Sequence, residues 1–331
     1  MEINLVTRSG GNNLRMGNNL RSLKILTAIT QNLRDLLNNS NIYCSHTSFD
    51  RAVSADFLKI IHPCFRSSDS IGEDKAQIDQ FLSSIIKTNP TSKAKPKVSH
   101  YNFGSCNFTI FHDLANVGWQ EFIDNIYILA KKEYHSITII VGDLFAMNCI
   151  GHEEKFPSFE ELIELPSCLI EKHCLLQDFT NGSPLVGIHM RKTDYRSWCN
   201  GKHFFEDDYY LKIANYVRCK FTENSCKLLF ISDEPIENAE IQKLSCHQNV
   251  VALFNKEEFH PDSLDLVLLS LCDLILGPIS TYNAFADDYR HLIASKTGMP
   301  GFFTTSRIIL SGNYDEDKRN IDNLELNISL P

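Results

Sequence analysis

Ten residues near the middle of the chain read Leu185-Val186-Gly187-Ile188-His189-Met190-Arg191-Lys192-Thr193-Asp194. The first six are mostly apolar, which is the pattern of a strand buried on both faces of a parallel sheet. The last four place a guanidinium, an ammonium, a hydroxyl and a carboxylate where that strand ends. In open α/β sheets ligands bind outside the carboxyl ends of the strands, so this segment indicates a binding site. Taken alone, it is equally well interpreted as an exposed basic turn.

Strands and helices alternate along the rest of the second half. Apolar runs predict further strands at 227–232, 250–254 and 274–277, and helical spacing predicts helices at 207–221, 236–244, about 264–271 and 281–289. In the first half, strands are predicted at 3–6 and 136–143 and a helix from residue 20 to 37. This alternation predicts the α/β class, with parallel sheets covered by helices on both faces.

The chain has 331 residues, which is long for one domain and favours two. The segment 178–184, which contains Asn181, Gly182 and Pro184, is the best linker. We therefore expect an N-terminal α/β domain at 1–182 and a C-terminal Rossmann-like domain at 183–331.

The composition excludes several classes of protein. A net charge of −9 argues against a nucleic-acid or anionic-membrane partner, which usually requires a basic face. Eleven cysteines without a regular framework favour a reduced, cytoplasmic compartment, and no apolar run is long enough for a membrane span. The cysteines and histidines lack the spacing of metal ligands, so no metal site is expected.

Polar clusters follow three of the four predicted strands in the second half. Besides the segment that starts at Arg191, residues 232–235 read Ser-Asp-Glu-Pro and residues 277–281 read Gly-Pro-Ile-Ser-Thr. Because neighbouring parallel strands end at one edge, these clusters could meet around one ligand. A cation for phosphate, a carboxylate for N–H or hydroxyl donors, and a helix N-terminus are what a nucleoside diphosphate needs. Each of the last two clusters alone is more simply a helix cap.

An early loop, residues 8–19, is rich in glycine and asparagine and precedes the first predicted helix. Backbone N–H groups at a helix N-terminus are a natural anion site. The loop matches neither the dinucleotide-binding glycine motif nor the P-loop, and a plain capped loop is an equal alternative.

At these residues the chain resembles the α1,2-, α1,6- and protein O-fucosyltransferase superfamily. The segment 189–195 resembles its His-x-Arg-Arg-x-Asp motif, with Lys192 at the second arginine, and 230–235 and 272–282 resemble its second and third motifs. Residues 16–19 resemble its N-terminal Gly-x-Gly-Asn-Gln loop, more weakly. The bacterial α1,2-type enzymes are the nearest branch. The resemblance implies a GT-B-like fold, two Rossmann-like domains with parallel sheets facing a cleft, the N-terminal one on the acceptor side.

The resemblance also implies an inverting, metal-independent transfer of fucose from GDP-fucose, the donor substrate, to a hydroxyl of a glycan or glycoprotein, without a cofactor. Arg191, on the β-phosphate, and Asp194 are the predicted catalytic residues. The predicted substrate-binding residues are Gly17, Asn18, Asn19, His189, Lys192, Ser232, Asp233, Glu234, Ser280 and Thr281. The catalytic base stays open between Asp194, Glu206 and the N-terminal loop.

Two alternatives remain beside this hypothesis. Polysaccharide pyruvyltransferases, or other nucleotide-sugar transferases, share a two-domain architecture and arginines for a phosphorylated donor. A protein that binds a sugar nucleotide without catalysis would need the same anion site, although the intact Arg191 favours an enzyme.

Overall fold

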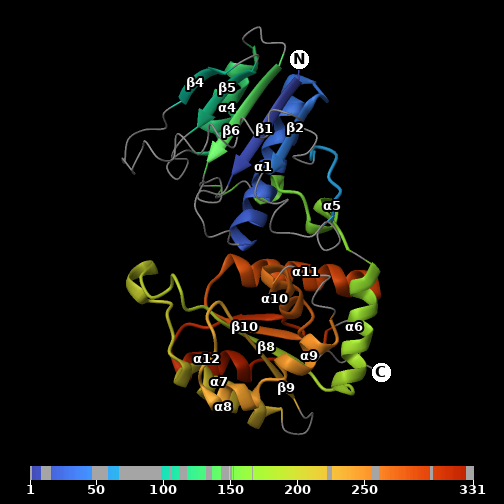
Figure 1. Cartoon of the computed structure of the whole chain (residues 1–331), viewed down its shortest axis with the longest axis vertical. Helices are drawn as coiled ribbons and strands as arrows, with labels where there is room; N and C mark the ends of the chain where they lie inside the picture. The colour runs from blue at the N-terminus through green and yellow to red at the C-terminus, as the bar shows by residue number, and fades with distance from the viewer. Residues whose placement is uncertain are drawn as a thin grey trace. The chain divides into compact units, whose positions relative to one another are not determined.

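The computed structural model divides into two compact units, Met1–Glu164 (unit 1) and Leu165–Pro331 (unit 2). Figure 1 shows the elements of each. The structure describes residues 2–8, 16–46, 59–66, 98–103, 106–111, 118–131, 136–142, 149, 151, 153–165, 167–221, 226–254, 261–298 and 301–325. The expected boundary after residue 182 follows the end of helix α6 (Ser167–Thr180). That helix packs against α11 (Thr281–Thr297) and so belongs with unit 2.

Unit 1 is built on a five-stranded sheet in the order β2-β1-β6-β5-β4. Its strands are β1 (Glu2–Arg8), β2 (Ile42–His46), β4 (Val98–Phe103), β5 (Cys106–Phe111) and β6 (Ser136–Gly142). All neighbours pair in parallel except β4 and β5, which are antiparallel. Helices α1 (Met16–Leu37) and α4 (Trp119–Lys131) bury Leu26, Ile29, Phe122 and Ile126 in one core with Ile3 of β1.

Four short elements complete the described part of unit 1. They are β3 (Lys59–Ile60), the 3₁₀ turn Glu153–Lys155, α5 (Phe159–Leu162) and β7 (Ile163–Glu164), and β3 and β7 pair in antiparallel. A capping box at Ser158 and Glu161 starts α5.

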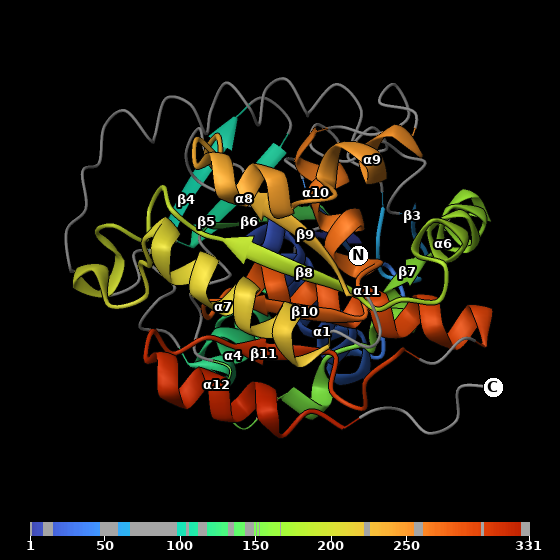
Figure 2. The ribbon, with the colours of Figure 1, turned by 90° about the horizontal axis from the view of Figure 1, so that it is seen from below.

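Unit 2 is built on a four-stranded, wholly parallel sheet in the order β11-β10-β8-β9, which Figure 2 shows from a second direction. Its strands are β8 (Leu185–Met190), β9 (Lys227–Ser232), β10 (Leu274–Gly277) and β11 (Arg307–Ile309). Its helices, besides α6 and α11, are α7 (Asp207–Lys220), α8 (Ala239–Leu244), α9 (His247–Ala252), α10 (Pro261–Ser270) and α12 (Tyr314–Asp322). The 3₁₀ turn Trp198–Gly201 lies between β8 and α7.

Helices cover both faces of the unit 2 sheet: α10 and α11 lie on one, and α7, α8 and α12 on the other (Figure 1). Val186 and Ile188 of β8 face the second group, where they pack with Ile213 and Ile321. Gly187 faces the first group, and a Cβ there would lie 2.8 Å from Cys272 Sγ. This central strand therefore needs glycine because a helix passes directly over it.

The predicted α/β class is confirmed in the described residues of both units, and all four strands of the unit 2 sheet are parallel. Two local predictions were wrong. The segment predicted as a strand at 250–254 belongs to helix α9 and the turn after it, with Val250, Val251 and Phe254 buried. Residues 16–19 were predicted as loop, but α1 already begins at Met16.

Candidate functional site

Strand β8 lies between β9 and β10, so the three predicted polar clusters emerge at the same edge of the sheet. Met190 pairs with Ser232 in the register of β8 and β9, and Ile188 pairs with Leu276 in that of β8 and β10. The predicted convergence of these strand ends is therefore present. We call the residues gathered there the strand-end site.

Arg191 is the first residue beyond β8, and two carboxylates hold its guanidinium. Its Nη2 lies 3.1 Å from Asp194 Oδ1, and its Nη1 lies 3.1 Å from Asp233 Oδ2. The ring of Tyr195 lies 5.7 Å from the guanidinium carbon. The Arg191 side chain keeps 15% exposure, so the fork of N–H donors is fixed in position and still open to solvent.

Asp233 organises the loop that follows β8. Its Oδ1 accepts a hydrogen bond from the Lys192 amide at 2.8 Å, and its Oδ2 accepts one from the Thr193 hydroxyl at 2.6 Å. Burial alone would raise the pKa of Asp233, but these hydrogen bonds and the Arg191 charge hold that pKa below its usual value. Asp233 is one of the predicted substrate-binding residues, and in the structure its carboxylate oxygens also contact neighbouring protein groups.

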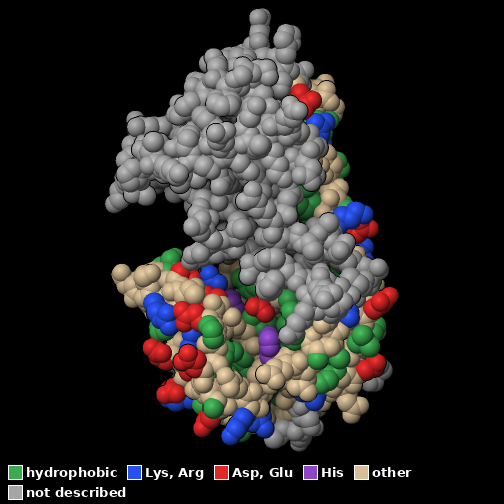
Figure 3. Space-filling model, in the orientation of Figure 1, with side chains coloured by type: hydrophobic (Ala, Val, Ile, Leu, Met, Phe, Trp, Pro, Cys, Tyr) green, Lys and Arg blue, Asp and Glu red, His purple; other side chains and the backbone are tan. Residues whose placement is uncertain are grey.

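The other charged residues of the site are also paired. Lys192 Nζ donates to Asp207 in the first turn of α7, and Arg196 makes a two-pronged contact with Glu234 at 2.7 and 2.9 Å. Counting Arg191, the pairs hold three cations and four carboxylates, a net charge of −1. Basic and acidic side chains intermingle in the same way on the face of unit 2 in Figure 3. An anion here must therefore be held by directed N–H donors, because these pairs carry no surplus of positive charge.

His189, predicted to bind substrate, lies in the interior directly before the Arg191 turn. It is 2% exposed, and its ring lies 5.2 Å from that of Tyr282 in α11. Burial, and then the nearby Arg191 charge, lower the pKa of His189 to about 4. Nδ1 is buried and has no hydrogen-bond partner in the described part of the chain. The imidazole is thus neutral near pH 7, and the cationic group of the site is Arg191.

Ser280 and Thr281 lie at the start of α11. Ser280 is the N-cap, and its hydroxyl accepts from the Tyr282 amide at 3.1 Å. Asn283, buried in the first turn, donates to the Pro278 carbonyl at 2.9 Å, and Tyr195 donates its hydroxyl hydrogen to the Ile279 carbonyl. These bonds fix the turn from β10 into α11 beside the β8 loop, where the helix N-terminus favours an anion.

The remaining predicted residues fall into two groups. Ser232 shapes the turn after β9, because its hydroxyl accepts from the Glu234 amide at 3.3 Å. The backbone of Gly17, Asn18 and Asn19 lies in the first turn of α1 in unit 1, and the preceding loop residues 9–15 lie outside the described residues.

Sequence patterns did not identify four residues that support the site. Tyr195, Arg196, Asp207 and Asn283 each make one of the contacts above. Only Tyr195 had a usable signal, since it immediately follows the motif that ends at Asp194. Asp207 and Arg196 pair with residues 15 and 38 positions away along the chain, which no local pattern encodes. Asn283 bonds to Pro278, five residues away, but no motif singled it out.

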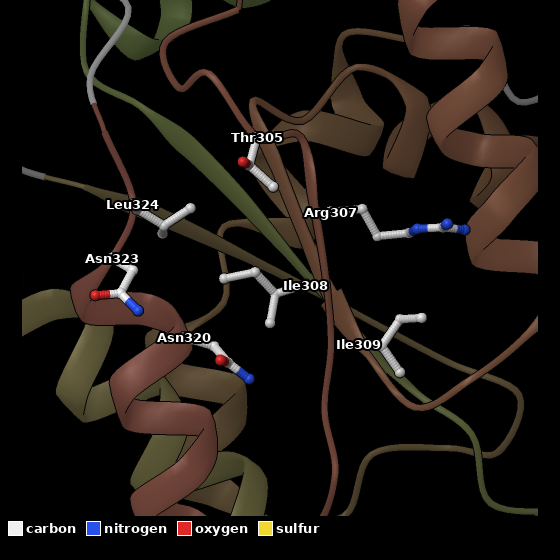
Figure 4. Close-up of a pocket in the computed structure, with 7 residues that line it drawn as sticks. All are labelled: Thr305, Arg307, Ile308, Ile309, Asn320, Asn323 and Leu324. Carbon is white, nitrogen blue, oxygen red and sulfur yellow. The ribbon is translucent and has the colours of Figure 1, made fainter.

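In the described part of the chain, no three histidine, cysteine or acidic side chains are grouped as metal ligands would be. None of the described helices combines the length and apolar character needed to cross a membrane. One pocket within these residues, of about 410 Å³, lies at the edge strand β11 and beside α12 (Figure 4). Thr305, Arg307, Ile308, Ile309, Asn320, Asn323 and Leu324 line it, and none of these is a residue of the strand-end site.

No protein-family model matches the chain, and no curated protein matches it significantly. Among solved structures, it is similar to POFUT1 in complex with GDP-fucose, with 12% identity and a TM-score of 0.46 over 93% of this chain and 98% of that one. NodZ alpha-1,6-fucosyltransferase co-crystallized with GDP has 13% identity and a TM-score of 0.40, over 87% and 92% of the two chains. Fucosyltransferase NodZ from Bradyrhizobium has 14% identity and a TM-score of 0.39, over 86% and 92%. At such low similarity, function has to be inferred from the side chains of this chain.

Proposed function

We propose that this protein is a glycosyltransferase that transfers fucose from GDP-fucose to a hydroxyl of a glycan or glycoprotein, with inversion and without a metal. The observation that carries the proposal is the Arg191 guanidinium, held at a strand end by Asp194 and Asp233 beside the N-terminus of α11. A diphosphate is the ligand that such a fork and helix end suit best.

In this proposal unit 2 binds the donor, and unit 1 supplies the acceptor side. The acceptor oxygen attacks the anomeric carbon of fucose while the bond from that carbon to the β-phosphate oxygen breaks. The electron pair of that bond stays on the phosphate, and the hydroxyl proton goes to a base. Arg191 stabilises the charge that gathers on the leaving diphosphate, and because it is already oriented, little reorganisation is needed.

The carboxylates around Arg191 have different tasks in this scheme. Asp233 holds both Arg191 and the loop amides, so we assign it to positioning. Asp194 lies 3.1 Å from the guanidinium and also accepts from the Thr193 hydroxyl at 3.3 Å. In this scheme it yields an N–H of Arg191 to the phosphate as the donor binds. The acceptor base is then Asp194 itself, the exposed Glu206 that precedes α7, or a group of the N-terminal loop.

Lys192 and Glu234 act mainly through their partners. Lys192 joins the β8 loop to α7 through Asp207, and Glu234 joins the same loop to β9 through Arg196. We assign Ser280, Thr281 and the amides that follow them to the phosphate oxygens. By the resemblance of motifs, we assign Gly17, Asn18 and Asn19, in the first turn of α1, to donor binding.

Incubation with GDP-fucose and a panel of oligosaccharides, with EDTA present, tests this function. We expect GDP release that depends on the oligosaccharide, and a product whose anomeric configuration, read by NMR, is opposite to that of the donor. GDP binding without release would favour the non-catalytic alternative. In a parallel incubation with phosphoenolpyruvate and the same oligosaccharides, release of inorganic phosphate, with no turnover of GDP-fucose in the first incubation, would favour a pyruvyltransferase.

A further inference from the structure

The loop Tyr195–Phe204, between β8 and α7, displays aromatic surface that the scheme above does not use. Trp198 is 42% exposed. One neighbouring ring, that of Tyr195, lies 4.9 Å from the indole, and another, that of His203, lies 5.2 Å from it. Nothing in the described part of the chain accepts a hydrogen bond from the indole N–H. The loop therefore exposes part of an indole ring, with an N–H donor at its edge.

The backbone of this loop is held in a costly conformation. Cys199, Asn200 and Gly201 follow one another with φ values of 51°, 56° and 75°, all in the left-handed region. A non-glycine residue there costs on the order of 1 kcal/mol, and such strain is concentrated at functional sites. The three residues reverse the chain so that His203 returns against Trp198.

Contacts to the sheet keep the loop in place. Arg196 binds Glu234 after β9 through two hydrogen bonds, and its guanidinium lies 5.3 Å from the Phe204 ring. Trp198 donates its backbone N–H to the Asp194 carbonyl at 2.9 Å. The indole is thus anchored on the segment that carries Arg191.

The aromatic face also lies close to the proposed phosphate position. The buried Tyr195 ring is 5.7 Å from the guanidinium carbon of Arg191 and 4.9 Å from the Trp198 ring. Its hydroxyl donates to Ile279, whose own side chain is 44% exposed at the end of β10. The site therefore has a charged centre at Arg191 and an apolar rim at Trp198 and Ile279, linked to Arg191 through Tyr195.

We propose that Trp198, backed by Tyr195 and His203, is a stacking platform for a neutral pyranose of the acceptor saccharide. This assignment rests on the proposed function, because it takes the sugar next to the reacting centre to be the acceptor. The C–H bonds of a pyranose face pack on an indole ring, and the indole N–H donates to a ring hydroxyl.

A guanine base is the main competitor for this platform. Its N–H edge requires acceptors, and the nearby carboxylates of Asp194, Asp233 and Glu234 are engaged by Arg191 and Arg196. A saccharide needs only the ring face and one donor, which are what the loop supplies.

The test compares Trp198→Ala, Trp198→Phe and a control, Leu175→Ala, which truncates an apolar side chain of similar exposure on α6. We expect Trp198→Ala to raise the acceptor KM about tenfold, as loss of a stacked ring does, with the GDP Kd unchanged within about twofold. Trp198→Phe should retain most of the affinity, and Leu175→Ala all of it. Circular dichroism checks that each variant folds.

Direct binding is measured by tryptophan fluorescence with a panel of neutral oligosaccharides ending in galactose, N-acetylglucosamine, glucose or mannose, with and without GDP. The other tryptophan, Trp119, is 2% exposed, so a change present in wild type and absent in Trp198→Phe reports the platform. No change with any oligosaccharide, or weakening of GDP binding by Trp198→Ala, would overturn the proposal. If GDP does not bind to the wild type at all, the proposed function fails, while the oligosaccharide titration still tests the platform.

Discussion

Replacing Asp233 by asparagine should both loosen the strand-end site and destabilise unit 2. The Asp233 carboxylate accepts from the Lys192 amide at 2.8 Å and the Thr193 hydroxyl at 2.6 Å, and it is paired with Arg191 at 3.1 Å. Asparagine keeps one acceptor oxygen but turns an NH₂ group toward donors. At least one hydrogen bond and the charge pairing are then lost.

The expected loss of unfolding free energy is about 2 to 4 kcal/mol. Hydrogen bonds to a charged group contribute about 1.5 to 3 kcal/mol each, and breaking a fully buried pair costs about 3 to 5 kcal/mol. The expected loss is smaller than the sum of these contributions because the Asp233 and Arg191 side chains keep 16% and 15% exposure. Water can therefore replace part of the lost interactions.

Urea unfolding at pH 7 measures the effect, with Asp178→Asn as the matched control because Asp178 is exposed and in no ion pair of the described residues. The pKa of Asp233 is lowered in the folded state, so its contribution is complete above the normal aspartate pKa and is lost as pH falls through the folded-state pKa. The difference between wild type and Asp233→Asn should therefore shrink in strongly acidic solution. A loss no larger than that of Asp178→Asn would refute the positioning role.

Two further predictions concern the interior of unit 2. Gly187→Ala should cost about 1 to 3 kcal/mol of unfolding free energy, because the new Cβ would lie 2.8 Å from Cys272 Sγ and 2.9 Å from Leu269 Cδ2. In the double variant, Cys272→Ala should recover part of that loss of unfolding free energy. If the effects of the two substitutions were strictly additive, the contact between residues 187 and 272 would not be the cause. His189 has a pKa lowered to about 4, so between about pH 4 and 6.5 the unfolded chain binds a proton that the folded chain does not. The free energy of unfolding should therefore rise as pH rises through that window, by up to about 1.4 kcal/mol per pH unit. His189→Gln should flatten this dependence in unfolding experiments from pH 4.5 to 7, and an unchanged slope would show that the imidazole is not held neutral.

Buried strands of unit 2 were predictable because their sequence is almost wholly apolar. The predicted bounds of β8, β9 and β10 coincide with the observed ones, since each run ends abruptly in polar residues. The same signal failed at 250–254, where a short apolar run lies in α9 and the turn after it. Periodicity cannot separate a buried strand from a buried helix over five residues. The three-residue edge strand β11 was too short to give a pattern.

The convergence of the site could be predicted, but the partners of its charges could not. Parallel neighbours must end at one edge, so Arg191, Asp233 and Ser280 were expected together. Which carboxylate pairs with Lys192 depends on how α7 packs, and nothing near Asp207 in the sequence distinguishes it from Asp208. For the same reason, the hydrogen bond that Asp233 accepts from the Lys192 amide could not be predicted from the sequence.

The central claim, a guanosine diphosphate site built on Arg191, is tested most directly by calorimetric titration of GDP, with UDP and CMP as controls, in the presence of EDTA. Wild type should bind GDP in preference to both controls. Arg191→Ala should weaken GDP binding on the order of 100-fold, and Arg191→Lys should recover only part of it, because lysine restores the charge but not the two-pronged geometry. Equal binding of the three nucleotides, or unchanged GDP affinity in Arg191→Ala, would contradict the account.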